Sequence, residues 1–389
     1  MKCGRRTLLL PDELKDAIVI DGHADTPQRF VDEGWEFVGP LGDGHLNLET
    51  ARRGGLAAEF FAIWVRPDEW RGRYAHRTLQ LIDGVYEQLR KHPRELVLGL
   101  CAEDVRRAHA DAKFCVLLGI EGGHSIENSL ALLRVYHRLG VRYMTLTWAN
   151  SNEWADSSGD LDDANIVHHN GLTHFGREVV REMNRLGMMV DVSHVSDKTF
   201  RDVMETTHAP VIASHSSARA LASAPRNLTD EQMRAVATSD GIVMVNFYAS
   251  FVDDAWRGTW SATSAEREAL TEKAAAEYRE RGEPVPYSVA LKVDREYFAA
   301  RAATLKRPSF ERVVEHIDHV AKVAGIDHVG IGTDFDGFGI LPEGLESAAD
   351  LPKIYESLMA RGYTSAQMRK ILGENLLRVM EAVQGAAEP

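Results

Sequence analysis

The sequence has few cysteines and no long apolar run, and these two shortages exclude whole classes of protein. Only three cysteines occur in 389 residues, an odd and sparse set that fits a reducing compartment and provides no disulfide framework. No window approaches the roughly 18 apolar residues of a membrane-spanning helix. The apolar stretch at residues 7–10 is also too short for the core of a signal peptide. We therefore expect a cytoplasmic protein without a membrane anchor.

Positive charge is also scarce, because 58 acidic residues outnumber 45 basic ones and the formal net charge is -13. Nucleic-acid binding requires clustered Lys and Arg, and an anionic membrane surface attracts the same residues. The composition therefore argues against both kinds of partner. Hydrophobic residues make up 44% and charged residues 26%, which is typical of a soluble globular protein.

What the sequence does contain is an alternation of short apolar runs and amphipathic stretches. Eight of the runs are predicted strands, at residues 17–21, 59–65, 114–120, 143–147, 188–192, 210–213, 241–246 and 328–332. Near-continuous runs such as GMMVDVSH suit strands buried on both faces, as in a parallel sheet. Eight strands alternating with helices predict an α/β fold, a (β/α)8 TIM-type barrel. The pattern alone leaves a doubly wound sheet as the alternative.

The segment 250–308 interrupts this alternation. It is charged and alanine-rich and has no buried-strand pattern, so it predicts a helical insertion before the last strand. Its role is open between a lid and a solvated helical hairpin. The tail TSAQMRKILGENLLRVMEAV predicts C-terminal helices, with Thr364 as a helix cap. Because no repeat or low-complexity linker divides the chain, we predict one domain over residues 1–389.

Side chains of the kinds that bind metals follow five of the predicted strands. They are His23, Asp25, Glu121, His194, His215 and Asp334. His23 and Asp25 are separated by one residue on a chain that is still extended, so their side chains point the same way. Glu121 ends a very apolar run, where an unpaired carboxylate would be costly. Each residue alone also has an ordinary interpretation, as a turn cap, a solvated loop residue or a structural histidine.

Taken together, these residues are more informative than any one of them. In a barrel, the carboxyl ends of all strands open onto one face, where active sites lie. Six such residues exceed the needs of one tetrahedral zinc and suit two metal ions that share a carboxylate. A hydroxide between two such ions is a strong nucleophile, because a metal lowers the pKa of water to about 7. Asp336 precedes a glycine and is interpreted as a turn former, and Asp191 as a hydrogen-bond partner of the ligands.

Six strings in this order resemble the membrane (renal) dipeptidases, the M19 peptidases of the amidohydrolase superfamily. They are DGHADTP, GIEGGHSI, DVSHVSD, ASHSSARAL, PRNLTDE and GTDFDG, and the resemblance runs over about residues 19–379. It implies a barrel metallopeptidase with two Zn2+ that hydrolyses the amide bond of dipeptides, L,D-dipeptides included, through a metal-bridging hydroxide. The partner is then a small peptide substrate. Dimers are common in that family, so a homodimer is a candidate assembly.

The resemblance also implies how the ligands divide between the two zinc ions. His23 and Asp25 resemble the ligands of the first zinc, and His194 and His215 those of the second. Glu121 resembles the carboxylate that bridges both ions, which makes it part of the catalytic centre.

Two further residues acquire roles from the resemblance. Asp334 resembles the catalytic acid/base that takes a proton from the bridging water and delivers it to the leaving amine. Arg226 resembles the residue that pairs with the terminal carboxylate of the substrate, and a planar guanidinium suits bidentate binding of a carboxylate. The ordinary alternative for Arg226 is a surface salt bridge.

One departure from the family concerns the group that polarises the scissile carbonyl. The strand YMTLT is normally followed by a histidine, whereas Trp148 stands here. Its indole has a single donor and carries no charge, and Asn150 and Asn152 are nearby amide donors that we predict to bind substrate with it. Alternatively, Trp148 only packs against the pocket wall. The departure leaves open another metal-dependent amide hydrolase with a shifted substrate, a deaminase or lactonase, and a non-catalytic zinc-containing binding protein.

Overall fold

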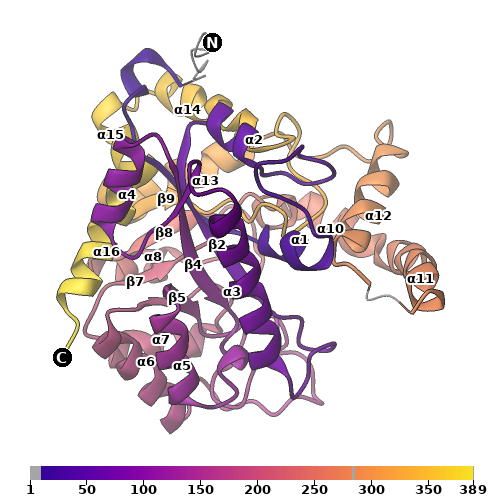
Figure 1. Cartoon of the computed structure of the whole chain (residues 1–389), viewed down its shortest axis with the longest axis horizontal. Coiled ribbons are helices and arrows are strands. Elements are labelled where there is room, and N and C mark those ends of the chain that lie inside the picture. The colour runs from indigo at the N-terminus through magenta and orange to yellow at the C-terminus, as the bar shows by residue number, and fades with distance from the viewer. Residues whose placement is uncertain (1–9, 283–284, 389) are drawn as a thin grey trace.

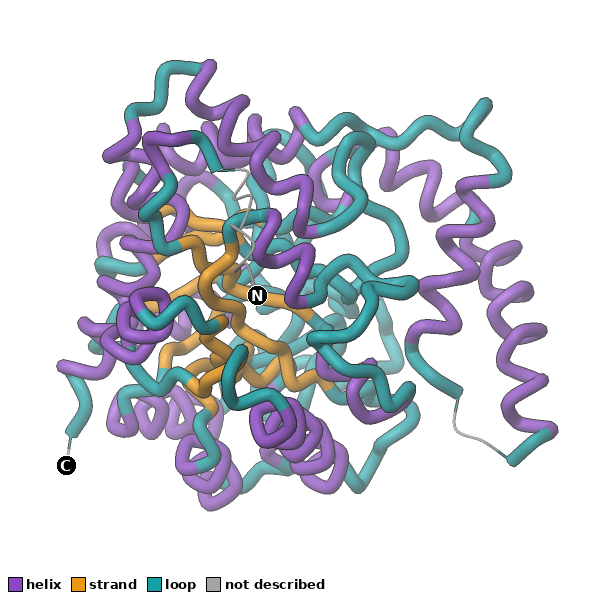
Figure 2. Tube along the Cα trace, turned by 45° about the horizontal axis from the view of Figure 1, so that its top comes forward, coloured by secondary structure: helices purple, strands orange, loops and turns teal. Residues whose placement is uncertain are grey.

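Eight parallel strands close into a barrel in the computed structural model, which describes residues 10–282 and 285–388. They are β1 (Val19–Ala24), β2 (Leu56–Trp64), β4 (Phe114–Glu121), β5 (Val141–Thr145), β6 (Met189–Asp191), β7 (Val211–Ala213), β8 (Ile242–Val245) and β9 (Val329–Ile331). The pairings β2–β4 and β1–β9 close the ring. Figures 1 and 2 show the strands at the centre with helices around them. The predicted (β/α)8 barrel is confirmed, and each predicted strand overlaps an observed one.

A further short strand, β3 (Leu96–Leu98), lies outside the ring and was not predicted. It pairs in parallel with β4 at Phe114, Cys115 and Val116, before the point at which β5 begins to pair with β4. Because β3 has three residues and is only partly buried, its apolar run is too short to stand out from the surrounding loops.

Helices surround the barrel along most of the chain. They are α1 (Pro27–Asp32), α2 (Leu48–Arg53), α3 (Tyr74–Lys91), α4 (Ala102–Ala110), α5 (Leu130–Arg138), α6 (His174–Leu186), α7 (Asp197–Thr206), α8 (Asp230–Thr238), α13 (Glu311–Ala324), α14 (Leu351–Ala360), α15 (Ser365–Arg369) and α16 (Asn375–Gly385). The cap expected at Thr364 is present, since its side chain accepts a hydrogen bond from the backbone N–H of Gln367. In the described ranges, no helix has the length and hydropathy needed to cross a bilayer.

The predicted insertion consists of helices between β8 and β9. These are α9 (Ala249–Val252), α10 (Asp254–Ala262), α11 (Ser264–Glu280) and α12 (Ser288–Ala299). Figure 1 shows α11 and α12 projecting to one side of the barrel. Arg267 joins these two helices through an ion pair of 2.7 Å with Asp294. Trp256 and Phe298 pack in a small apolar cluster that holds the insertion together.

The barrel interior is filled by inward side chains that support the site. Phe60 of β2 meets Tyr143 of β5 across the intervening strand, with ring centroids 5.0 Å apart. A Cβ atom at Gly119 of β4 would lie 2.0 Å from the ring of Tyr143. Glycine at position 119 therefore leaves the space that lets Tyr143 reach the carboxyl end of the barrel.

Candidate active site

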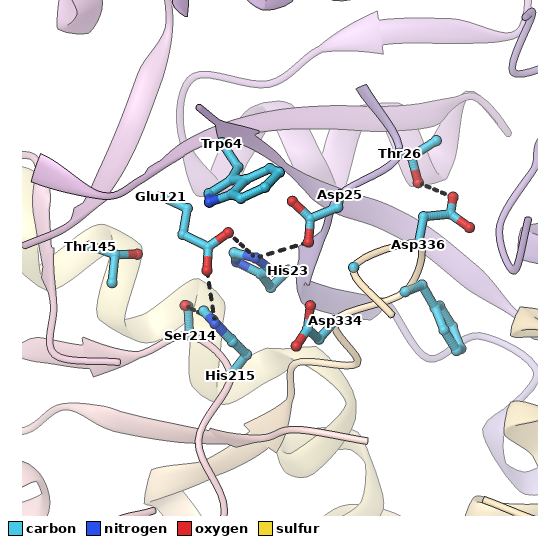
Figure 3. Close-up of polar contacts among 12 residues, drawn as sticks. His23, Asp25, Thr26, Trp64, Glu121, Thr145, Ser214, His215, Asp334 and Asp336 are labelled. Atoms are coloured by element: carbon cyan, nitrogen blue, oxygen red, sulfur yellow. Dashed lines mark hydrogen bonds and ion pairs between the residues drawn. The ribbon is translucent and has the colours of Figure 1, made fainter. Parts of the chain in front are cut away.

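The five predicted metal ligands meet at the carboxyl ends of β1, β4, β6 and β7. Figure 3 shows Glu121 between the imidazoles of His23 and His215. The Nε2 atom of His23 lies 3.3 Å from Oε2 of Glu121. On the other oxygen of Glu121, Oε1, the Nε2 atoms of His194 and His215 lie at 3.0 and 3.4 Å. Asp25 Oδ2 is 3.9 Å from His23 Nε2. The structure thus brings together side chains that are far apart in the sequence.

Hydrogen bonds fix the tautomer of His23. The hydroxyl of Tyr143 donates to the carbonyl oxygen of Gly22 at 3.2 Å, and its oxygen lies 2.8 Å from Nδ1 of His23. Because that hydroxyl proton is already used, Nδ1 of His23 is the donor to the Tyr143 oxygen. In the neutral imidazole, Nε2 of His23 is then the nitrogen left to bind a metal. Burial lowers the pKa of His23, but the Glu121 carboxylate beside Nε2 outweighs this effect and raises it.

The same logic applies to His215. The hydroxyl of Ser214 donates to Oδ2 of Asp191 at 2.6 Å, and Nδ1 of His215 lies 2.7 Å from the Ser214 oxygen. Nδ1 of His215 is therefore protonated and Nε2 is bare. Asp191 also accepts hydrogen bonds from the backbone N–H groups of Ser193 and Ser214, so it supports the ligand from behind. The sequence-based interpretation of Asp191 agrees with this position.

The charges at the barrel mouth suit a cation. Burial, reinforced by the nearby carboxylates of Glu121 and Asp334, raises the pKa of Asp25 well above its usual range. Burial and the Arg226 charge lower the pKa of His194 to about 4, so its imidazole is neutral. Within the described residues, Nε2 of His23 and Oδ1 of Asp25 have no hydrogen-bond partner although both are buried. Crowded carboxylates and bare imidazole nitrogens are the surroundings that a divalent metal relieves.

Two overlapping groups of ligand atoms are close enough to hold metal ions. The atoms of His23, Glu121 and His215 lie within 4.8 Å of one another, as do those of His23, Asp25 and Asp334. His23 belongs to both groups, and its ring stacks on that of His215 with centroids 3.8 Å apart. Imidazole nitrogen and carboxylate oxygen are donors that zinc accepts, so the residues present fit the predicted metal.

Asp334 follows β9 and faces the group of predicted ligands around Glu121, which we call the centre (Figure 3). Its Oδ2 accepts a hydrogen bond of 2.8 Å from the amide nitrogen of Asn246. Burial raises the pKa of Asp334 to about 6, with His23 and Arg226 opposing the rise and Glu121 adding to it. A carboxyl with a pKa near neutrality is suited to accept and return a proton.

Arg226 is buried beside the centre and is not a surface ion pair. Its Nη1 donates to the backbone carbonyl of His215 at 2.6 Å, and its guanidinium stacks 4.6 Å from the ring centroid of Phe251. Among the residues described here, its Nε and Nη2 atoms have no hydrogen-bond partner. Burial lowers the pKa of Arg226 to about 10, which leaves it charged at neutral pH. The free edge of the guanidinium can therefore receive a carboxylate.

Asp336 lies in the turn after β9, and its carboxylate joins that turn to two distant segments. Its Oδ2 accepts from the hydroxyl of Thr26 at 2.8 Å, and its Oδ1 accepts from the backbone N–H of His45 at 2.6 Å (Figure 3). Asp336, Asp334 and His194 have φ values of 63°, 63° and 68°, in the left-handed region that non-glycine residues seldom adopt. Strained backbone of this kind is concentrated at functional sites.

The three residues predicted to bind substrate after β5 differ in their surroundings. Trp148 is half-buried, and its ring centroid lies 6.5 Å from that of His194. The amide group of Asn152 donates to the carbonyl of Leu146 at 2.8 Å and accepts from the N–H groups of two following residues, so it shapes its own loop. Asn150 donates to the carbonyl of Ser151 at 3.2 Å. Their roles toward substrate remain predictions.

Three residues of the centre were missed in the sequence. Ser214 directly precedes His215, and Asn246 ends a predicted strand, so each is a polar residue at a strand end and shares the signal that identified the ligands. Tyr143 begins a predicted strand and cannot be told from an ordinary core aromatic without the structure.

This geometry agrees with the comparison with known families. The model described as membrane dipeptidase, peptidase family M19, matches residues 12–389. The chain belongs to the membrane dipeptidase family. It is a metallo-dipeptidase, a hydrolase that acts on peptide bonds, and membership implies a metal cofactor.

Three solved structures resemble the chain over nearly its whole length. The probable dipeptidase PvdM of Pseudomonas aeruginosa is 26% identical, with a TM-score of 0.79 and coverage of 97% of this chain and 98% of that one. Dipeptidase AC, an M19 metallopeptidase, is 28% identical with a TM-score of 0.75, covering 95% and 99%. A Rhodobacter sphaeroides metallopeptidase, liganded with a phosphinate mimic of the dipeptide L-Ala-D-Ala, is 27% identical with a TM-score of 0.73, covering 95% and 100%.

Proposed function

We propose that this M19 metallo-dipeptidase is a binuclear zinc enzyme that hydrolyses dipeptides, L,D-dipeptides among them. The observation that supports the proposal most strongly is the position of Glu121. Its two carboxylate oxygens face different imidazoles, His23 on one side and both His194 and His215 on the other, at 3.0 to 3.4 Å. One carboxylate between two sets of nitrogen donors is the arrangement that a metal-bridging ligand needs.

Each protein ligand has a place in this proposal. His23 and Asp25 would hold one zinc, His194 and His215 the other, and Glu121 both. When bound, the two ions supply Lewis-acid polarisation of the amide carbonyl and a water whose pKa is lowered to about 7. The hydrogen bonds that Nδ1 of His23 and Nδ1 of His215 donate to the hydroxyl oxygens of Tyr143 and Ser214 keep both rings in the tautomer that leaves Nε2 free for a metal.

The remaining polar groups handle the substrate and its protons. The free Nε and Nη2 edge of Arg226 binds the terminal carboxylate of the dipeptide. Asp334 accepts the proton of the attacking water and passes it to the leaving amine, which departs as a neutral amino group. The amide of Asn246 orients the Asp334 carboxylate by donating to Oδ2. Binding of the terminal carboxylate of a short substrate at Arg226 places its one amide bond near Glu121.

A small cavity lies on the Asp25 side of the site. A cavity of about 350 Å³ adjoins Asp25 and is lined by Arg29 of α1 and by Tyr287 and Arg295 of the insertion. This volume lies at the lower end of the range for small-molecule sites. The Rhodobacter sphaeroides relative binds a mimic of L-Ala-D-Ala, which favours dipeptides with a D-residue at the carboxyl end as a substrate class.

The direct test is a screen of L,L and L,D dipeptides with the zinc-loaded enzyme, read out as free amino acids. The proposal predicts hydrolysis of free dipeptides and none of the same dipeptides after chelation of the metal. Failure to release amino acids from every dipeptide, with metal bound at the centre, would contradict it.

Asp334→Asn tests the proton transfer within the same proposal. The amide cannot accept a proton, so kcat is expected to fall roughly 100- to 10,000-fold. Metal content measured by mass spectrometry should stay at the wild-type level, because the variant keeps all five predicted ligands. Turnover within a few-fold of wild type would remove Asp334 from the mechanism, and loss of metal together with activity would make it a ligand instead.

A further inference from the structure

Trp64 is the last residue of β2 and stands beside Glu121 at the barrel mouth. The two residues are Cα partners in the β2–β4 pairing. Phe60 lies four residues before Trp64 and points into the barrel, where it meets Tyr143. Since side chains alternate along a strand, Trp64 also faces the barrel axis. It is therefore placed among the predicted metal ligands, although the sequence gives it the pattern of a core residue.

The indole N–H of Trp64 is a buried donor without an acceptor. The side chain is buried, with 4% of the residue exposed. In the part of the chain that the structure describes, Nε1 has no hydrogen-bond partner. Figure 3 shows this nitrogen on the edge of the ring that is turned toward the Glu121 carboxylate. A buried unpaired N–H costs free energy, and a ligand oxygen at the centre would remove that cost.

The orientation of this indole is fixed by its neighbours. Its ring centroid lies 4.8 Å from that of Trp148 and 5.0 Å from that of Tyr287. Tyr287 comes from the insertion and is itself held by a hydrogen bond of 2.6 Å from its hydroxyl to the carbonyl of Gly337. The backbone carbonyl of Trp64 accepts a 2.6 Å hydrogen bond from Gln28. A donor held in this way needs no reorganisation when charge develops nearby.

Two other buried indoles show that an unpaired N–H alone is not enough. Trp154 and Trp256 also have no acceptor for Nε1 in the described ranges, but they pack against Phe175 and Phe298 and neither belongs to a barrel strand. Trp64 differs because it stands in register with Glu121 at the mouth of the barrel.

We propose that the indole N–H of Trp64 donates a hydrogen bond to the scissile carbonyl oxygen and holds it more strongly as that oxygen becomes an anion. This inference rests on the proposed dipeptide hydrolysis. It assigns Trp64 as a catalytic residue and Trp148 and Tyr287 as the rings that position it. An indole donates only and does not titrate in the physiological range, so Trp64 stabilises charge and transfers no proton.

The test compares Trp64→Phe with Trp256→Phe in the zinc-loaded full-length enzyme. Both variants remove a buried, unpaired indole N–H and keep an aromatic ring, but only the first does so at the centre. Loss of one oxyanion donor lowers kcat roughly 100-fold or more. Because bound metal ions would also stabilise this oxygen, we expect a smaller loss of kcat here, of about tenfold or more. We expect kcat of Trp64→Phe to fall by that factor, with KM and metal content unchanged.

A second readout is independent of turnover. A phosphinate dipeptide mimic carries the tetrahedral oxygens that the carbonyl acquires, so its Kd, measured by calorimetry, should rise by the same factor in Trp64→Phe and stay unchanged in Trp256→Phe. Equal Kd values for wild type and Trp64→Phe would overturn the inference. So would metal loss in Trp64→Phe, or equal effects in both variants, since each result would give the indole a packing role. An inactive wild type would refute the proposed function, and the phosphinate measurement would still decide the role of Trp64.

Discussion

At the scale of single residues, two of the predicted ligands are oriented by hydrogen bonds to residues behind them. His23 depends on the hydroxyl of Tyr143, and His215 depends on Ser214, which in turn is held by Asp191. These contacts decide which nitrogen faces Glu121. The nitrogen that a histidine offers to a metal is therefore decided by the hydrogen bond that its other ring nitrogen makes.

Arg226→Lys tests whether the buried guanidinium binds the substrate carboxylate. The lysine keeps the charge but loses the planar pair of donors, and a hydrogen bond to a charged group is worth about 1.5–3 kcal/mol. We expect kcat/KM for a free dipeptide to fall roughly 10- to 100-fold by this arithmetic. The matched control is the same dipeptide with a C-terminal amide, on which wild type and variant should be similarly slow. An equal loss on both substrates would indicate that Arg226 supports only the backbone of His215.

The sequence predicted the ligands because they are exceptions to their surroundings. A histidine or carboxylate directly after an apolar run is conspicuous, and His23, Glu121 and Asp334 all have that context. Tyr143 and Trp64 have no such signal, because an aromatic residue in a strand is ordinarily part of a core. Their positions facing the centre follow from register and from the space left by neighbours, which only coordinates give.

At the scale of elements, the loop after β9 is packed against the centre without spare room. A Cβ atom at Gly337 would lie 2.2 Å from Oδ1 of Asp334 and 2.4 Å from Oδ2 of Asp25. Gly337→Ala should therefore displace these carboxylates and lower metal content and kcat together. The control is Gly258→Ala in α10, where an added Cβ meets nothing within 4 Å. Full metal occupancy in Gly337→Ala would contradict this prediction, because it would show that the loop moves to accommodate the added methyl group.

Helix α13 is joined to two neighbouring segments through a neutral histidine. His316 Nδ1 accepts from the N–H of Ala218 at 2.9 Å, and Nε2 donates to the carbonyl of Val252 at 3.1 Å. Burial lowers the pKa of His316 to about 4, from 6.5 in the unfolded chain. Between these values the unfolded chain binds a proton and the folded one does not. The contribution of His316 is therefore complete above pH 6.5 and is lost as the pH falls toward 4.

This pH dependence gives a stability measurement. Denaturant unfolding at pH 7 and pH 4.5 should show that His316→Gln removes about 2 to 3 kcal/mol of the wild-type pH dependence of the unfolding free energy. His174→Gln is the control, because the side chain of His174 is 86% exposed. An identical pH dependence in wild type and His316→Gln would contradict the assignment.

The elements themselves were predictable to different degrees. The eight barrel strands follow from buried apolar runs, and the insertion follows from the absence of such runs in residues 250–308. The strand β3 was missed because three residues carry too little pattern. Nothing in the sequence indicated that Tyr287 of the insertion reaches back to Gly337, since that contact depends on how α12 is placed over the barrel.

At the scale of the whole molecule, the barrel brings residues from distant parts of the sequence to one face. Parallel strands all present their carboxyl ends on one face, so residues from β1, β4, β6, β7 and β9 meet there although the chain between them is long. The sequence could therefore predict that the candidate ligands meet at one face of the barrel. It could not predict distances, tautomers or the sharing of His23 between two groups of ligand atoms, because these depend on the final packing.

The proposed function requires that these side chains hold two metal ions with Glu121 between them. The most direct measurement is anomalous diffraction at the zinc absorption edge from crystals grown with zinc. We expect two peaks at the barrel mouth, one beside His23 and Asp25 and one beside His194 and His215, with Glu121 in contact with both. A single peak there, or zinc bound only elsewhere on the molecule, would contradict it.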